Sequence, residues 1–138
     1  MDITIDSGAC DTVIPTGECS WIPIVDGPLS LEGSEYEVAN GEGIPNLGER
    51  RCIAMTEGGG SVKEIHWQVA DVHKTLLSLS KLADMGFDSH LSKNGGYLID
   101  TVTGEQIPMR RKGNVYTMKM WVKAKPPTET AGPFGRRG

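Results

Sequence analysis

The chain has 138 residues, of which 38% are hydrophobic and 23% charged, with a mean hydropathy of −0.28. This length suits one domain with a sizeable core, and the composition is that of an ordinary globular protein. No apolar run reaches the roughly 18 residues of a membrane span. Eighteen glycines and eight prolines are many for this length and favour a mostly β chain rich in turns.

Charge is unevenly distributed along the chain. Residues 1–108 carry 6 Lys and Arg against 17 Asp and Glu, whereas residues 109–138 carry 8 against a single acid, Glu129. The C-terminal segment could therefore contact nucleic acid, although a solvated basic linker is the more usual meaning of such a composition. We expect no membrane partner.

Cysteine and histidine spacing argues against a metal site. Three cysteines, Cys10, Cys19 and Cys52, form no C-x-x-C pair and do not combine with the three scattered histidines. We expect no disulfide framework, no metal and no cofactor. A reducing compartment fits the odd cysteine count, and the N-terminus lacks the basic and apolar regions of a signal peptide, so we expect a cytoplasmic protein.

The first third of the chain contains short apolar segments separated by turn residues. Residues 2–6 alternate polar and apolar side chains, as a half-buried strand does. Ser7-Gly8-Ala9 interrupts this pattern, and residues 12–14 resume it until Pro15 ends it. Residues 21–25 and 29–31 are predicted to form short strands around the Asp26-Gly27 turn.

Two hairpins and one helix follow. Residues 35–39 and 44–48 flank Asn40, Gly41, Glu42 and Gly43, which predicts a hairpin with a glycine-rich tip. Residues 51–55 pair with 62–69 in a second hairpin, whose turn spans residues 58–61. The helix is predicted over 78–85, where Ser78 can cap its start and Gly86 can end it. Further strands are predicted over 87–91, 97–100 and 115–121, and residues 123–138 are predicted to be a linker or disordered tail.

The chemistry of the chain centres on Asp6-Ser7-Gly8. Asp6 ends an alternating strand, Gly8 permits a tight turn, and an apolar strand follows. The whole segment from Asp6 to Pro15 resembles the active-site segment of retropepsins, the aspartic proteases of retroviruses and retrotransposons. Several later segments are similar to copia-type retrotransposon polyproteins, so the resemblance covers roughly residues 2–121. These segments are Val69-Ala70-Asp71-Val72, Leu76 to Leu82 with Gly86, Leu98-Ile99-Asp100, Thr103-Gly104 and Gly113 to Tyr116.

This resemblance implies a fold and a set of site residues. The fold is all-β, a retropepsin-like acid-protease half-barrel with one short α-helix, over residues 1–122. Only five residues precede Asp6, where the family has a longer segment, so we expect an N-terminally truncated domain. Asp6 is the implied catalytic carboxylate, Ser7 would brace a partner loop, and Gly8 and Ala9 would line the substrate cleft.

Two further assignments in the substrate cleft, the role of Asp11 and the position of the flap tip, each have an alternative. Asp11 would contact the substrate main chain, as the matching residue of the family does, or cap its own turn. The flap tip is assigned to residues 40–43, because a closing flap needs a flexible backbone and should be the first long hairpin after the catalytic loop. The glycine-rich turn at 58–61 is the rival candidate.

One usable catalytic loop is present, and the mechanism needs two carboxylates. Asp84-Met85-Gly86 has the wrong middle residue and Asp100 to Gly104 has the wrong spacing. The working site is therefore expected across a C2 homodimer, with Asp6 contributed twice. The predicted function is an aspartic endopeptidase that cleaves peptide bonds of a retrotransposon polyprotein. The alternative is a catalytically inactive module of the same fold that binds peptides or supports dimerisation.

Overall fold

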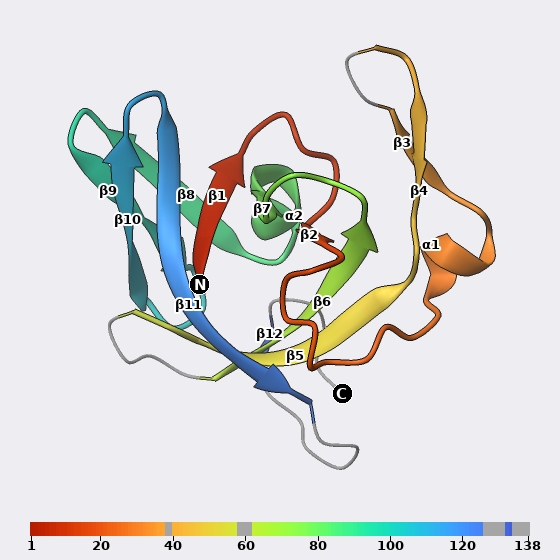
Figure 1. Ribbon diagram of the computed structural model, residues 1–138. Coiled ribbons are helices and arrows are strands. Elements are labelled where there is room, and N and C mark those ends of the chain that lie inside the picture. Colours follow the sequence, from red (N-terminus) through yellow and green to blue (C-terminus); the bar gives the residue numbers. More distant parts are fainter. Residues whose placement is uncertain (38–39, 58–61, 126–131, 134–138) are drawn as a thin grey trace.

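A closed strand barrel forms the centre of the protein in the computed structural model, which describes residues 1–37, 40–57, 62–125 and 132–133 (Figure 1). Six strands follow one another around the barrel, and the sixth pairs back to the first. In order around the barrel they are β1 (Asp2–Asp6), β7 (Leu76–Ser78), β2 (Val13–Pro15), β6 (Lys63–Ala70), β5 (Glu49–Thr56) and β11 (Val115–Ala124).

The barrel closes because the long strand β11 pairs with two others along its length. Its first half lies antiparallel to β1, with Ile3 opposite Met118, and its second half lies antiparallel to β5, with Ala54 opposite Val122. On its other side, β1 lies parallel to β7. β1, which ends at Asp6, is thus held by hydrogen bonds on both edges, and this fixes the position of its last residue.

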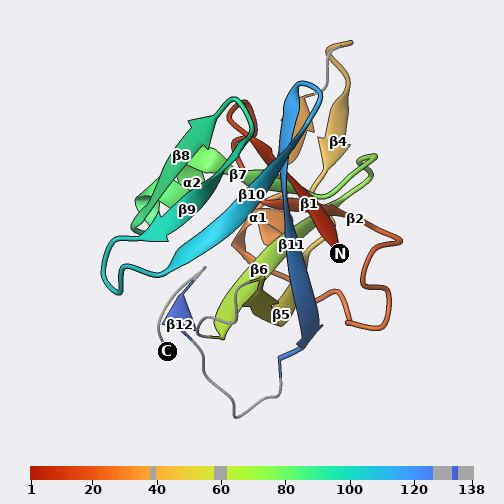
Figure 2. The same cartoon turned by 90° about the vertical axis from the view of Figure 1, so that its left-hand side faces the viewer.

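The remaining elements extend the barrel on two sides. Strands β10 (Gln106–Lys112), β9 (Gly95–Asp100) and β8 (Phe87–Ser92) continue the sheet beyond β11, and Figure 2 shows them folded away from the barrel. The separate hairpin of β3 (Glu35–Glu37) and β4 (Gly43–Pro45) stands on the opposite side. The helices α1 (Pro28–Leu31) and α2 (Leu79–Asp84) are both short.

Apolar side chains from alternate strand positions fill the barrel. Ile3 and Ile5 of β1 point inward between exposed or half-buried neighbours, as the two-residue period of a strand requires. Trp67, fully buried on β6, is the largest side chain of the core. Other members come from every part of the barrel and its extension: Ile14, Cys52, Leu77, Leu82, Phe87, Leu98, Ile107, Met118 and Met120.

The predicted all-β class with short helical content is confirmed, as are both hairpins and the helix capped by Ser78. Two predicted strands are wrong. Residues 21–25 form no strand beyond an isolated bridge between Val25 and Glu49. Residues 29–31 belong to α1, because Pro28 fits the first helical turn and Ser30 bonds back to the Gly27 backbone.

The basic C-terminal segment is partly folded. β11 continues to Ala124, two residues beyond the predicted domain boundary, and β12 (Gly132–Pro133) pairs with β6, so this part of the expected tail is not a free linker. Arg110 and Arg111 lie in β10, where Arg110 forms a two-pronged ion pair with Glu57. The rest of the predicted tail, residues 126–131 and 134–138, lies outside the described residues.

Candidate active site

Asp6 is the last residue of β1 and lies opposite Ser78 of the parallel neighbour β7. The chain then turns through residues 7–12 and returns as β2, which pairs with both β7 and β6. Because β1 is paired on both edges, the backbone position of Asp6 is fixed. Its half-buried side chain lies where the strand passes into the surface loop. This is the placement that the sequence pattern of Asp6-Ser7-Gly8 predicts.

The turn after Asp6 is held by the aspartate itself. The Gly8 backbone N–H donates to Asp6 Oδ1 over 2.8 Å. A Cβ atom at Gly8 would lie 3.3 Å from that same oxygen, so the turn leaves little room for a larger residue. Asp6 is half-buried while Ser7 and Gly8 are exposed. No hydrogen bond of the Ser7 hydroxyl occurs within the part of the chain that the structure describes, so this group is available to a partner.

Ser78 supports the loop from beneath. Its hydroxyl donates to the Ala9 carbonyl over 2.8 Å and accepts from the Lys81 N–H at the start of α2 over 3.3 Å. Its backbone N–H donates to Thr12 Oγ1 over 3.2 Å. Because Ser78 is fully buried, these bonds are shielded from water. Ser78 therefore caps α2 and holds the loop after Asp6 at two points, Ala9 and Thr12.

Asp11 connects this loop to the β3–β4 hairpin. Its Oδ2 accepts from the Tyr36 hydroxyl of β3 over 3.2 Å, and its Oδ1 lies 3.8 Å from Lys81 Nζ. Asn46 Nδ2 donates to the same Tyr36 oxygen over 3.0 Å and to Gln68 Oε1 over 2.9 Å. Asp11 is thus bound by partners outside its own turn, which differs from the turn-capping alternative.

Tyr36 is a neutral donor in this network. Burial raises the pKa of its phenol well above the ordinary value, and the nearby Asp11 carboxylate adds to this, although the bond from Asn46 acts the other way. The hydroxyl is therefore protonated at neutral pH and serves as the donor to Asp11. This bond ties the root of the β3–β4 hairpin to the loop that follows Asp6.

The proposed flap tip lies at the far end of the same hairpin. Glu37 and Gly43 form the last pair of the β3–β4 ladder, and Asn40 Oδ1 accepts from the Glu42 N–H within the tip. Gly41 has a φ of 81°, which favours glycine. Figure 1 shows the hairpin rising above the barrel, and no hydrogen bond joins residues 40–43 to residues 6–9 in the described structure. The rival flap turn, 58–61, lies outside the described residues.

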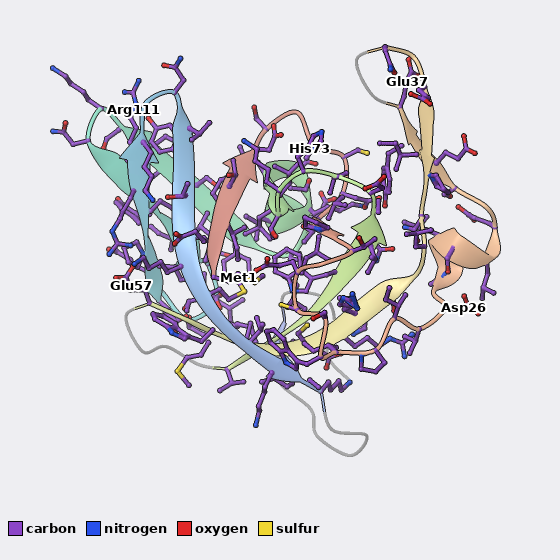
Figure 3. All side chains as sticks on the ribbon, in the orientation of Figure 1. Met1, Asp26, Glu37, Glu57, His73 and Arg111 are labelled. Carbon is purple, nitrogen blue, oxygen red and sulfur yellow. The ribbon has the colours of Figure 1, made fainter. Side chains whose placement is uncertain are left out.

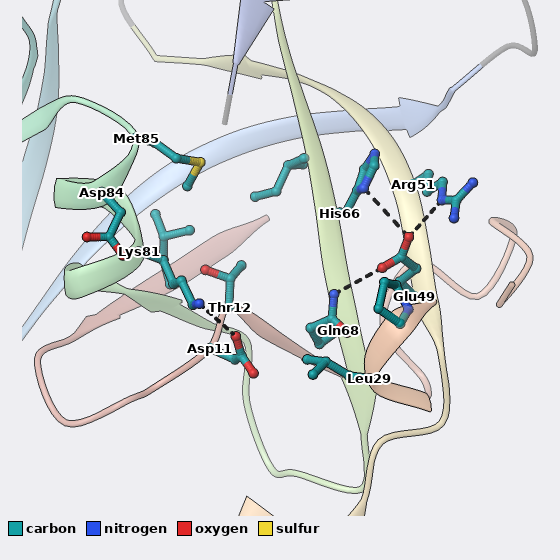
Figure 4. Close-up of a pocket in the computed structure, with 13 residues that line it drawn as sticks. Asp11, Thr12, Leu29, Glu49, Arg51, His66, Gln68, Lys81, Asp84 and Met85 are labelled. Carbon is teal, nitrogen blue, oxygen red and sulfur yellow. Dashed lines mark hydrogen bonds and ion pairs between the residues drawn. The ribbon is translucent and has the colours of Figure 1, made fainter. Parts of the chain in front are cut away.

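A pocket of about 760 Å³ opens on the Asp11 side of the loop, and Figure 4 shows its polar walls. Glu49 accepts from Arg51 Nε over 2.8 Å and from Gln68 Nε2 over 3.2 Å, and its carboxylate lies 3.6 Å from His66 Nδ1. Apolar side chains complete the lining: Pro28, Leu29, Ile65, Leu77 and Met85. A groove with charged and apolar walls suits a peptide side chain better than a purely apolar ligand.

The other two aspartates weighed as partners of Asp6 have structural roles. Asp84 ends α2, and Gly86 follows with a φ of 92°. Asp100 is buried at a turn, where its Oδ1 accepts from the Val102 and Thr103 N–H groups and its Oδ2 lies 3.3 Å from Lys63 Nζ. Asp84 lines the pocket that Asp11 and Thr12 also line, but neither Asp84 nor Asp100 begins an Asp-Ser-Gly or Asp-Thr-Gly triplet. Asp6-Ser7-Gly8 is therefore the one such motif in the sequence.

The described residues contain no group of three or more His, Cys, Asp and Glu side chains able to hold a metal ion, and no helix long and apolar enough to cross a membrane. The three cysteines are free thiols, with Cys10 exposed in the loop that follows Asp6.

Sequence reasoning missed the residues that support the site rather than form it. Tyr36, Asn46 and Gln68 lie 10 to 25 positions away from the residues that they bond. No local pattern marks them. Ser78 was expected only as a helix cap, and its bond to Ala9 links positions 69 residues apart. Such contacts emerge from strand pairing, which brings the side chains together after the barrel has closed.

No family model, curated protein or solved structure matches this chain. The function proposed below therefore rests on the residues and geometry described above.

Proposed function

We propose that this protein is an aspartic endopeptidase of the retropepsin kind that works as a homodimer on a polypeptide, such as a retrotransposon polyprotein. The observation that carries the proposal is the position of Asp6: a carboxylate at the end of a doubly paired strand, on a tight glycine turn, beside an exposed Ser7. A single carboxylate cannot act both as base and as acid in one step, so a second copy supplies the other Asp6.

The chemistry follows from the electrostatics of two close carboxylates. Two such groups a few ångströms apart cannot both ionise easily, so they share one proton and titrate as a pair. The ionised carboxylate takes a proton from a water molecule, which attacks the scissile carbonyl carbon. The protonated carboxylate donates to the carbonyl oxygen, and the tetrahedral intermediate then collapses with protonation of the leaving amine.

The surrounding geometry supports binding of an extended peptide. Asp11 lies between the catalytic loop and the hairpin, where an oxygen of its carboxylate can accept from a peptide N–H. The pocket beyond Asp11 offers space for a flanking side chain. The β3–β4 hairpin, joined to Asp11 through Tyr36, is our candidate for a flap that closes over the substrate and excludes water.

A peptide library read by mass spectrometry tests this function. We expect cleavage by the unchanged chain and a loss of about 10³-fold on Asp6→Asn, which preserves the size of the side chain. Asp26→Asn, in an exposed loop, is the matched control and should cleave normally. Cleavage that persists in Asp6→Asn would disprove the proposal. A folded, dimeric chain that binds peptides without cutting them would instead identify the inactive binding module.

A further inference from the structure

A second pocket, of about 310 Å³, lies directly beside Asp6, and the proposed catalytic steps do not use it. The end of β1 and Ser7 form one part of its wall, and Lys74 and Asn114 are further polar members. The rest comes from α2, from β8 and from the start of β11. We call its four large apolar residues the collar: Leu79, Leu91, Val115 and Tyr116.

The collar exposes apolar surface next to the catalytic loop. Leu91 is 46% exposed although its side chain is large and apolar. It lies on β8, the last strand of the sheet, where every residue after Phe87 is exposed. A single exposed leucine is ordinary, but Leu91 lies on an outermost strand beside three other apolar residues, and such a combined surface favours association with another chain. The Tyr116 hydroxyl donates to the Ser92 carbonyl over 2.8 Å and ties β11 to β8, so the collar is a fixed surface.

The collar and the flap hairpin lie on different sides of the catalytic loop. Tyr36 and Asp11 place the hairpin on one side, whereas the pocket beside Asp6 places Leu91 and Val115 on the other. In Figure 3, Glu37 of the hairpin and Arg111 near the β10–β11 turn stand at opposite edges of the molecule, with His73 between them. A peptide that enters beneath the hairpin therefore leaves the collar uncovered.

We infer that the collar is the surface on which the second copy of this chain docks. The inference rests on the proposed function, which requires two copies of Asp6 within a few ångströms of each other. The C2 axis must then pass close to Asp6 and Ser7, so the surface around these residues meets its own copy. On the side away from the hairpin, that surface is the collar. Leu79, Leu91 and Val115 of each copy pack across the axis and bring the two Ser7 hydroxyls into proximity.

Sedimentation over a wide concentration range tests this inference without a substrate. Leu91→Glu places a charge in the collar at an exposed position, and we expect it to raise the dimer dissociation constant at least tenfold. Val102→Glu is the matched control because Val102 is 89% exposed on the β9–β10 turn, outside the collar. It should leave the dissociation constant within twofold of the unchanged chain. Asp6→Asn should also dimerise normally.

These measurements separate the inference from the proposed function. A chain that dimerises through Leu91 but cleaves no peptide supports the docking surface and disproves the protease. A monomer at every concentration overturns the docking surface, as does a Leu91→Glu variant that dimerises normally. If Leu91→Glu does not fold, hydrogen exchange of the unchanged chain gives the answer. Dilution should speed exchange at residues 89–92 and 113–116 but not at 101–104, and equal exchange at both concentrations overturns the inference.

Discussion

The Tyr36 hydroxyl donates to Asp11 Oδ2 over 3.2 Å and so joins the β3–β4 hairpin to the loop after Asp6, 25 residues earlier in the chain. Asn46 holds the same hydroxyl from the other side. The bond orients the Asp11 carboxylate at the place where the substrate main chain is proposed to lie. The hairpin and the loop should therefore respond together to a change at either residue.

Tyr36→Phe tests this connection. Losing one hydrogen bond should lower the free energy of unfolding by about 1 kcal/mol. Because Asp11 then loses its orientation, we expect KM to rise several-fold with a smaller change in kcat. Tyr97→Phe is the control, since it removes a hydroxyl from β9 with the ring stacked on His90. An unchanged KM in Tyr36→Phe would show that Asp11 does not depend on this bond.

Ser78→Ala should damage both stability and activity. The change removes the helix cap at Lys81 and leaves the Ala9 carbonyl without its donor. We expect a loss of about 1–2 kcal/mol from the cap alone. Activity should fall further than the unfolded fraction accounts for, because the loop that carries Asp6 loosens. Kinetics measured well below the melting temperature, compared with Ser20→Ala in an exposed turn, separate the two effects. Full activity in Ser78→Ala would contradict the supporting role of Ser78.

Asp100 should make stability dependent on pH at the acidic end. Burial opposes its ionisation, but the Val102 and Thr103 N–H groups and Lys63 outweigh this and hold the pKa of the carboxyl below its usual value. A lowered folded-state pKa stabilises the fold above the unfolded-state pKa, about 3.9, and this contribution is lost as the pH falls through the folded-state pKa.

Asp100→Asn should therefore lower the free energy of unfolding by about 3 kcal/mol at pH 7, because buried Lys63 then loses the negative charge of Asp100 beside it. The difference from the unchanged chain should stay constant down to about pH 5 and narrow below about pH 4. Urea unfolding at several pH values measures it, with Asp88→Asn on the exposed part of β8 as the control. A difference that does not vary with pH would show that the charge of Asp100 is not the cause.

Gly96→Ala should destabilise the extension of the barrel. A Cβ atom at Gly96 would overlap the backbone carbonyl of His90 on the paired strand β8, and a backbone cannot move aside as a flexible side chain can. We expect a loss of about 1–3 kcal/mol in denaturant unfolding. Gly17→Ala, which meets no atom within 4 Å, should be neutral. Because β8 carries Leu91, weaker dimerisation should accompany the loss. Equal stability of the two alanine variants would refute this packing argument.

The regular strands were predictable because their signal is local. Residues 51–55 are mostly apolar and residues 62–69 largely alternate, with a glycine-rich sequence between them, and they form most of β5 and β6. The segment at 29–31 was predicted wrongly because three residues are too few to show a hydrophobic period. The preceding Pro28 favours the first turn of a helix there. The parallel pairing of β1 with β7 could not be predicted locally, since 72 residues separate Thr4 from its partner Leu76.

The residues of the candidate site also divide into those with a local sequence signal and those without one. Asp6, Ser7 and Gly8 could be proposed from the sequence because they form a short contiguous motif, and the structure places them at the end of β1 and on the turn that follows. Tyr36 could not be proposed, because its contact with Asp11 depends on the position of the hairpin in the folded chain. The collar was missed for a similar reason: Leu79, Leu91 and Val115 become neighbours only when α2, β8 and the start of β11 come together.

The pairing of β1 with β7 and β11 also bears on when the turn after Asp6 becomes ordered during folding. Both partners of β1 are distant from it in sequence, since Thr4 pairs with Leu76 and Ile3 with Met118. Closing such long loops is entropically costly, so contacts of this kind form after local hairpins such as β5–β6 and β8–β9. The strand that carries Asp6 is therefore among the last to be fixed. On this view a chain still emerging from the ribosome has no ordered turn at Asp6, and the proteolysis that we propose begins only after β11 is complete and two copies have met.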